Sequence, residues 1–168
     1  MSDKIVKKVE NLPQLTAVKR TDKLIQRVAA YARVSTGKEE QQTSIVAQKE
    51  YYTDYIKSHA GWQFVGVYAD EGISGCSTKR REQFKQLMSD CMAGKIDMVL
   101  TKSISRFGRN TVDTLTAIRE LKSKGIGVYF EKEQVWTMDS KGEFIITLMS
   151  SLAQEESRSM SENILWAV

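Results

Sequence analysis

Apolar residues follow two different periods along this chain. Four short runs rich in β-branched, aromatic and small apolar residues predict strands at residues 28–34, 63–68, 98–101 and 127–130. Between these runs, apolar residues recur every three or four positions and predict helices near residues 39–57, 81–93 and 111–124. This order of strand and helix predicts an α/β fold, with a mostly parallel, flavodoxin-like open sheet and helices on both faces.

The second predicted helix has the clearest apolar face. Five of its residues fall at positions i, i+3, i+4, i+7 and i+8, namely Phe84, Leu87, Met88, Cys91 and Met92. This spacing places Cys91 in the core, as a packing residue without a chemical role. Three glycines stand where predicted helices end, at Gly61, Gly94 and Gly125.

The two ends of the chain differ from the middle. Residues 1–26 show no periodicity and predict a flexible basic arm, ahead of an α/β domain over residues 27–140 that carries the candidate chemistry. Residues 141–168 predict the start of a long helix, with no capping signal before it. Its apolar end, from Leu165 onward, suggests a partner surface or a chain cut within the helix.

Composition excludes several classes of protein. The chain has 168 residues, 41% of them apolar and 27% charged, with no apolar segment typical of a membrane span or signal peptide, so we expect a cytoplasmic protein. Two cysteines and one histidine are too few for a structural zinc site. Residues 1–27 carry the whole net charge of +4 and the remainder is neutral, so bulk charge alone does not identify a polyanionic partner.

The first predicted strand contains an unexpected charge. One of its faces is apolar, with Val28, Ala30, Ala32 and Val34, whereas the other carries Tyr31, Arg33 and Ser35. An unpaired charge inside a covered sheet is costly, so Arg33 is expected at the carboxyl edge of the sheet, beside Ser35 and facing a ligand.

Further charged residues follow the second and third predicted strands. Because ligands bind at the carboxyl ends of parallel strands, Asp70, Arg81, Arg106 and Arg109 are expected to gather around Ser35. A serine among arginines suits phosphoryl transfer, since guanidinium groups stabilise charge on phosphate oxygens where no metal does so. One histidine makes a Ser-His-Asp relay improbable. Asp70 and Arg33 both remain candidates for taking the proton of Ser35.

Several motifs in this order resemble those of the serine site-specific recombinases, the resolvase/invertase family. They are Tyr31-Ala-Arg33-Val-Ser35-Thr36, Asp70-x-Gly-x-Ser74-Gly75, Arg81-x-x-Phe84, Ser105-Arg106-x-x-Arg109-Asn110 and Ala153-Gln154-x-Glu156. The second motif and the spacing after it look most like the large serine recombinases of phages and conjugative transposons. Ser105 departs from the pattern, because family members often have aspartate there, and so no carboxylate role carries over to this position.

The resemblance implies a DNA strand transferase that works through a 5′-phosphoserine at Ser35, with no cofactor, metal or ATP. It also implies double-stranded DNA as substrate, a homodimer, and a tetramer in the synaptic complex. The implied catalytic residues are Ser35, Arg33, Arg81, Arg106, Arg109, Asp70 and Gln48. The implied DNA contacts are Tyr31, Ser74, Lys102 and Asn110, and the implied interface or activation residues are Glu156 and Glu162.

Less specific interpretations exist for most of these residues. Ser35 alone would be a helix N-cap, Ser74 a turn residue, and each arginine a solvated surface group. The main alternative function is a non-covalent phosphate- or nucleotide-binding α/β module, disfavoured because the loop after the first strand has a single glycine, Gly37. An inactive dimerisation domain is a third possibility. His59, Trp62 and Trp136 are assigned to packing.

Overall fold

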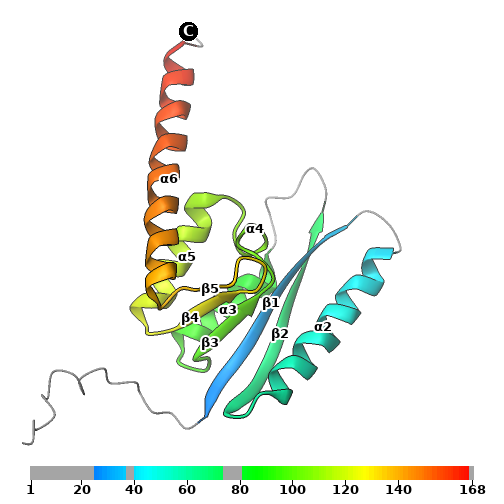
Figure 1. The fold of residues 1–168 in the computed structure, drawn as a ribbon. Coiled ribbons are helices and arrows are strands. Elements are labelled where there is room, and N and C mark those ends of the chain that lie inside the picture. The colour runs from blue at the N-terminus through cyan, green and yellow to red at the C-terminus, as the bar shows by residue number, and fades with distance from the viewer. Residues whose placement is uncertain (1–24, 37–39, 74–80, 167–168) are drawn as a thin grey trace, which may run out of the picture.

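The computed structural model describes residues 25–36, 40–73 and 81–166, with the side chains of residues 35–36, 40–44 and 72–73 outside this description. A five-stranded sheet in the order β2-β1-β3-β4-β5 forms the centre of the molecule (Figure 1). Its strands are β1 (Gln26–Thr36), β2 (Trp62–Ile73), β3 (Met98–Thr101), β4 (Gly127–Phe130) and β5 (Val135–Trp136). The first four are parallel and β5 is antiparallel to β4, which confirms the predicted mostly parallel open sheet.

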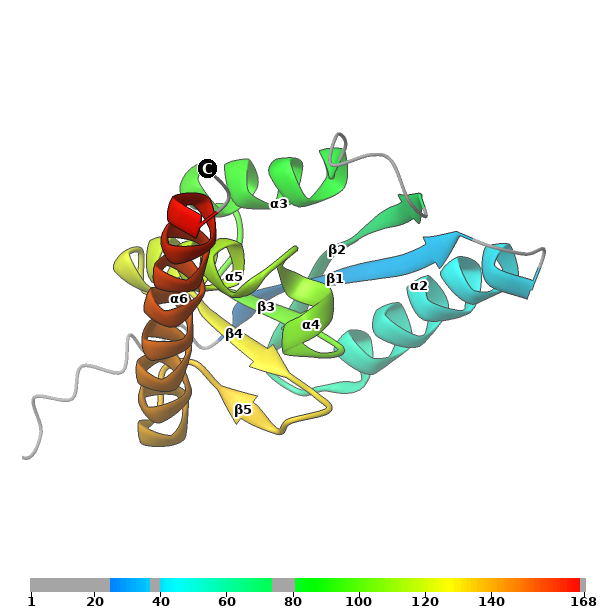
Figure 2. The ribbon, with the colours of Figure 1, turned by 90° about the horizontal axis from the view of Figure 1, so that it is seen from above.

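Helices cover both faces of the sheet, as predicted. They are α2 (Glu40–Ser58), α3 (Glu82–Met92), α4 (Ile104–Phe107), α5 (Thr111–Ser123) and α6 (Ser140–Trp166). Seen from above, α2 lies on one side of the sheet and α3 and α5 lie on the other (Figure 2). The first half of α6 packs beside α5, and its second half extends beyond the rest of the domain (Figure 1).

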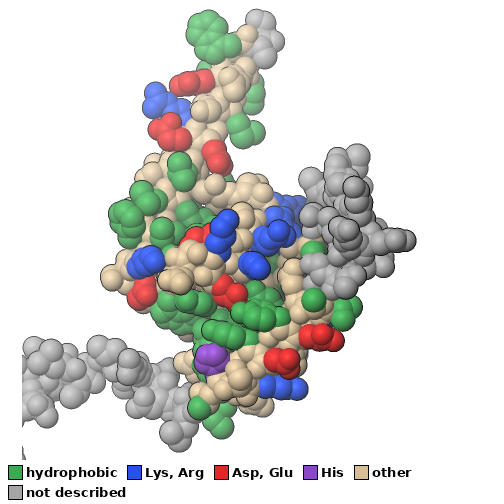
Figure 3. Space-filling model, turned by 45° about the vertical axis from the view of Figure 1, so that its right-hand side comes forward, with side chains coloured by type: hydrophobic (Ala, Val, Ile, Leu, Met, Phe, Trp, Pro, Cys, Tyr) green, Lys and Arg blue, Asp and Glu red, His purple; other side chains and the backbone are tan. Residues whose placement is uncertain are grey.

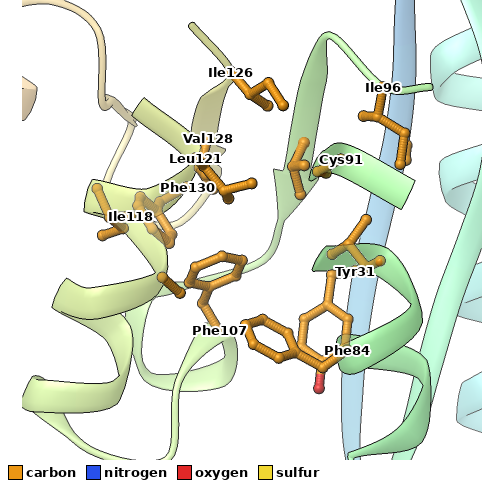
Figure 4. Packing of buried hydrophobic residues seen from close by; sticks show 14 of the residues in the cluster. Tyr31, Phe84, Cys91, Ile96, Phe107, Ile118, Leu121, Ile126, Val128 and Phe130 are labelled. Carbon is orange, nitrogen blue, oxygen red and sulfur yellow. The ribbon is translucent and has the colours of Figure 1, made fainter. Parts of the chain in front are cut away.

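The alternation of side chains along β1 separates two cores. Val28, Ala30 and Ala32 pack with residues of α2, whereas Ala29 and Tyr31 face the larger core beneath α3 and α5. In that larger core the rings of Tyr31, Phe84 and Phe107 meet edge to face, with centroids 5.1 Å apart for Tyr31 and Phe84 and 5.2 Å apart for Phe84 and Phe107 (Figure 4). Arg33, two residues after Tyr31, continues this side of β1 toward its carboxyl end, where the candidate site lies.

The predicted helix stops and the apolar face of α3 are confirmed. Gly61, Gly94 and Gly125 all have positive φ, at 80°, 77° and 73°, a conformation that glycine adopts without a Cβ clash. Cys91 is buried as expected, and burial raises the pKa of its thiol to about 12, so it stays protonated at neutral pH.

Two features at the ends of elements differ from the prediction. The second strand was expected to end at residue 68, but β2 continues to Ile73 because it pairs with β1 along its length, and this places Asp70 inside the strand, not in the loop after it. The last helix begins at Ser140, and the Asp139 side chain accepts a 2.8 Å hydrogen bond from the Gly142 N–H. The prediction that this helix lacks a capping signal was therefore wrong.

The predicted arm at residues 1–26 falls almost wholly outside the described residues, which begin at Ile25. Among the described helices, none combines the length and apolar character needed to cross a membrane. β5 was not predicted, because two residues are too few for a periodic signal. Its Trp136 indole packs over Gly127, where Cζ3 lies 2.7 Å from the position that a Cβ would occupy.

Candidate active site

The carboxyl end of β1 is tied to α4 by two hydrogen bonds. Arg33 Nη2 donates to the carbonyl oxygen of Ser105 at 2.7 Å, and Arg106 Nη1 donates to the carbonyl oxygen of Arg33 at 2.7 Å. Ser35 follows two residues after Arg33 in the same strand, opposite Gly72 of β2. The structure therefore brings Arg33 and Arg106 together at the strand that carries Ser35, as the sequence predicted. The Ser35 side chain lies outside the described part.

This end of the sheet is electropositive. Burial holds the pKa of the Arg33 guanidinium below its ordinary value, and the positive charges of Arg81 and Arg106 lower it further. Neighbouring cations of this kind repel one another, and an anion bound among them would relieve that repulsion. Across the described residues, no group of three or more His, Cys, Asp or Glu side chains could hold a metal ion.

Arg81 lies inside the protein, with a relative exposure of 8%. Its Nε donates to the Tyr31 hydroxyl at 3.2 Å, its Nη1 to the Asp113 carboxylate at 2.8 Å, and its Nη2 to the carbonyl oxygen of Phe107. The guanidinium carbon also lies 3.7 Å from the centroid of the Phe84 ring. Arg81 thus supports the site from behind, and a phosphate contact would require it to exchange at least one of these partners.

Asp70 is buried as well, at 6% exposure, and caps α3 from a neighbouring strand. Its carboxylate accepts hydrogen bonds from the backbone N–H groups of Gln83 and Phe84, at 3.0 and 2.9 Å. It accepts a third from the Tyr31 hydroxyl at 3.0 Å. Because these three donors engage its oxygens, the hypothesis that Asp70 takes the proton of Ser35 finds no support in this arrangement.

Tyr31 is fully buried between these two groups. Its hydroxyl donates to Asp70 and accepts from Arg81, and burial raises its pKa to about 12. The predicted contact between Tyr31 and DNA is therefore not available from this position. The alternation rule correctly placed Tyr31 on the same face as Arg33 but did not reveal how far along the strand the core extends.

The buried Tyr31 hydroxyl predicts a loss of stability in alkali. Its pKa rises from 10 in an exposed tyrosine to about 12, so the folded state binds more protons and the free energy of unfolding falls as pH rises through that window. We expect Tyr31→Phe to reduce the loss between pH 9.5 and 11.5 by roughly 2 kcal/mol. Urea unfolding at several pH values measures this. Tyr129→Phe is the control, and an equal reduction in both variants would contradict the prediction.

Other predicted contacts lie on the surface. The side chains of Lys102, Arg109 and Asn110 are exposed, and Figure 3 shows Lys and Arg side chains gathered on one face of the molecule. Lys102 is adjacent to Lys132, whose N–H donates to the Lys102 carbonyl oxygen at 2.8 Å. Asn110 is the N-cap of α5, accepting a hydrogen bond from the Asp113 N–H at 2.8 Å, so it has a structural role in addition to the predicted one.

The remaining predicted residues are spread more widely. Gln48 is half-buried on α2, one turn before the buried Tyr52. Glu156 accepts a 3.2 Å hydrogen bond from the Thr111 hydroxyl at the start of α5, whereas Glu162 pairs with Arg158 within α6. Ser74 lies outside the described residues.

Sequence reasoning missed Asp113, which contacts two of the predicted arginines. Its carboxylate accepts a hydrogen bond from the Arg81 side chain at 2.8 Å and another from the Arg109 backbone N–H at 2.9 Å. Asn110 and Asp113 stand at the N-cap and N3 positions of α5, a spacing typical of paired capping residues that could have drawn attention to Asp113.

Solved recombinase domains share this fold. The structure resembles a resolvase family site-specific recombinase from Streptococcus pneumoniae, with a TM-score of 0.71, 28% identity, and coverage of 84% of this chain and 95% of that one. It also resembles the N-terminal catalytic domain of TP901-1 integrase, with a TM-score of 0.55, 26% identity, and coverage of 79% and 98% respectively. This chain therefore has the fold of a recombinase catalytic domain.

The sequence comparisons identify the family. The family model "Resolvase, N terminal domain" matches residues 28–168, and the chain belongs to this family. The transposon Tn3 resolvase of Escherichia coli is 32% identical over 136 residues, which is 81% of this chain and 66% of that protein. The chain thus spans just under two thirds of the length of that relative. The predicted resemblance to the resolvase/invertase family is confirmed.

Proposed function

We propose that this protein cuts and rejoins DNA at specific recombination sites, using Ser35 as the nucleophile. The observation that carries the proposal is the pairing of Arg33 and Arg106 at the end of the strand that holds Ser35. The names of the relatives, which are a transposon resolvase and site-specific recombinases, support it from sequence.

In the proposed step the Ser35 Oγ attacks a backbone phosphorus. An Oγ–P bond forms, the bond from phosphorus to the 3′-oxygen breaks, and the departing 3′-oxygen gains a proton while Ser35 loses one. Guanidinium groups beside Ser35 would stabilise the negative charge that builds on the phosphate oxygens. The product is a 5′-phosphoserine and a free 3′-hydroxyl. Attack by a 3′-hydroxyl reverses the step, so rejoining needs neither ATP nor a metal ion.

The arginines fall into two groups in this scheme, those that would contact the phosphate and one that would support the site. Arg33 and Arg106 would contact the phosphate, and the exposed Arg109 would approach it from the start of α5, whereas Arg81 would hold the site from behind. With Asp70 occupied by three donors, the arrangement favours Arg33 as the group that assists removal of the Ser35 proton. As a cation two residues from Ser35, Arg33 would assist by stabilising the negative charge that develops on Oγ as the proton leaves.

The partners follow from the surface of the domain. We propose double-stranded DNA as substrate, bound in part by Lys102 and Asn110. α6 carries a row of exposed apolar side chains, namely Phe144, Leu148, Leu152, Met160, Ile164, Leu165 and Trp166. Apolar area of this extent is typical of an interface, so α6 is the proposed contact of a homodimer, with a tetramer forming at synapsis.

The nature of the covalent bond tests the proposal. We expect the protein, incubated with a supercoiled plasmid carrying the DNA that flanks its gene, to give a DNA–protein adduct that survives denaturation, with or without EDTA. Proteolysis followed by mass spectrometry should then find the nucleotide on the peptide that contains Ser35. An adduct on another residue would refute Ser35 as the nucleophile. Tight phosphate binding with no adduct would favour a non-covalent binding module.

A further inference from the structure

Asp113 links two arginines of the site that are far apart in sequence. Its carboxylate Oδ2 accepts from Arg81 Nη1 at 2.8 Å and from the Arg109 backbone N–H at 2.9 Å. Arg81 comes just before α3, whereas Arg109 ends the turn that leads into α5. One carboxylate therefore joins a buried cation to the backbone from which an exposed arginine projects.

Arg81 cannot shift independently of this contact. Its side chain is 9% exposed, and its three guanidinium nitrogens contact the Tyr31 hydroxyl, the Phe107 carbonyl oxygen and Asp113. A cation buried to this degree needs a nearby counter-charge, because removing one member of such a pair leaves the other uncompensated. Asp113 supplies that charge, so its own position is fixed by the core of the domain.

The turn between Phe107 and Asn110 is equally constrained. A Cβ on Gly108 would overlap the Thr114 hydroxyl and would lie 2.6 Å from the Thr114 backbone nitrogen, so this turn lies directly against the first turn of α5. The Thr114 N–H and hydroxyl both donate to the Asn110 carbonyl oxygen, at 3.0 and 2.9 Å. The backbone of Arg109 is thus held from both sides, with Asp113 fixing its N–H.

We propose that Asp113 is a positioning residue, which orients Arg109 for the phosphate by binding its backbone N–H while anchored to the buried Arg81. This role rests on the proposed recombinase function and adds to it a residue that itself makes no contact with DNA.

The variant Asp113→Asn tests the role, because it keeps the size of the side chain and removes its charge. The assay is single-turnover adduct formation on the plasmid carrying the gene's flanking DNA. At saturating protein, we expect the rate to fall on the order of 10-fold to 100-fold, the effect of a misplaced catalytic group. The half-saturating protein concentration should change by less than about threefold, since binding to the ground state is not affected. Asp54→Asn, on the exposed face of α2, is the matched control and should match the wild type.

A double variant separates positioning from a general structural role. If Asp113 acts through Arg109, adding Asp113→Asn to Arg109→Ala should slow adduct formation by less than about twofold, because the group being positioned is already gone. Independent, multiplicative losses would overturn the proposal. So would a wild-type rate in Asp113→Asn. An absence of adduct in the wild type would instead refute the proposed function itself.

A measurement on the wild-type protein keeps the test valid if Asp113→Asn does not fold. The Arg109 amide proton should exchange with deuterium more slowly than an amide without a partner, because it is hydrogen-bonded to the Asp113 carboxylate, and NMR measures the rate. The amide of Val112, which is exposed on the first turn of α5 and lacks that bond, is the internal reference. An Arg109 amide that exchanges as fast as the reference would overturn the proposal.

Discussion

Ser35→Ala is expected to abolish covalent attachment to DNA and to leave the fold unchanged. Without Oγ no atom of this side chain can bond to phosphorus, so the rate of adduct formation should fall on the order of 10⁴-fold or more, as when other enzymes lose a nucleophile. The substitution lies near the end of β1, where the backbone is paired with β2, and alanine fits a strand there. Denaturing electrophoresis of the protein with plasmid carrying the flanking DNA measures the loss.

Measurements of DNA binding and a control variant distinguish loss of the nucleophile from loss of DNA binding or of the fold. Non-covalent DNA binding should persist in Ser35→Ala, because phosphate attraction comes from the arginines and lysines. Ser58→Ala is the matched control, since that hydroxyl lies at the far end of α2 and donates to the Tyr55 carbonyl oxygen. An adduct formed by Ser35→Ala at the wild-type rate would disprove the proposed nucleophile, whatever the fold.

Asp70→Ala is expected to produce the largest loss of stability among the site residues. It removes a buried carboxylate that accepts from the Gln83 and Phe84 N–H groups and from the Tyr31 hydroxyl. A helix cap contributes about 1 kcal/mol, and each buried hydrogen bond to a charged group somewhat more, so the free energy of unfolding should fall by about 3 kcal/mol. Urea denaturation monitored by circular dichroism provides the measurement.

Two further variants test whether the loss of stability comes from the capping carboxylate of Asp70. Asp70→Asn keeps one acceptor oxygen but brings an NH₂ group toward the donors, so an intermediate loss of about 1–2 kcal/mol is expected. Asp54→Ala, at an exposed position on α2, should stay within about 0.5 kcal/mol of the wild type. If Asp70→Ala proved as stable as Asp54→Ala, the capping role assigned to Asp70 would be wrong.

The same arrangement explains why no general base is evident from the motif alone. From sequence, Asp70 and Arg33 were both candidates for taking the Ser35 proton, and in the structure the two residues are opposite each other in the sheet register. In the structure the carboxylate faces the start of α3 and the Tyr31 hydroxyl. Its hydrogen bonds therefore stabilise the wall of the site, and Arg33 remains the charged residue of β1 nearest to Ser35.

Local patterns in the sequence were sufficient for the four parallel strands, for the helices other than α4, and for one face of the site. The spacing of Phe84, Leu87 and Cys91 predicted the buried side of α3, and the alternation along β1 placed Tyr31 and Arg33 on a common face. Both signals depend only on helix and strand geometry, which neighbouring residues impose. The rule that parallel strands present ligand sites at their carboxyl ends then brought Arg106 to Arg33, as the structure shows.

Tertiary structure alone decided which polar groups face inward. Sequence did not distinguish the buried Arg81 from the exposed Arg109, and it did not reveal Asp113 as the carboxylate between them. Periodicity describes a single element, whereas the partly buried ion pair between Arg81 and Asp113 depends on the approach of the segment before α3 to the start of α5. Those distances are set by packing between segments far apart in the chain, and no local pattern contains them.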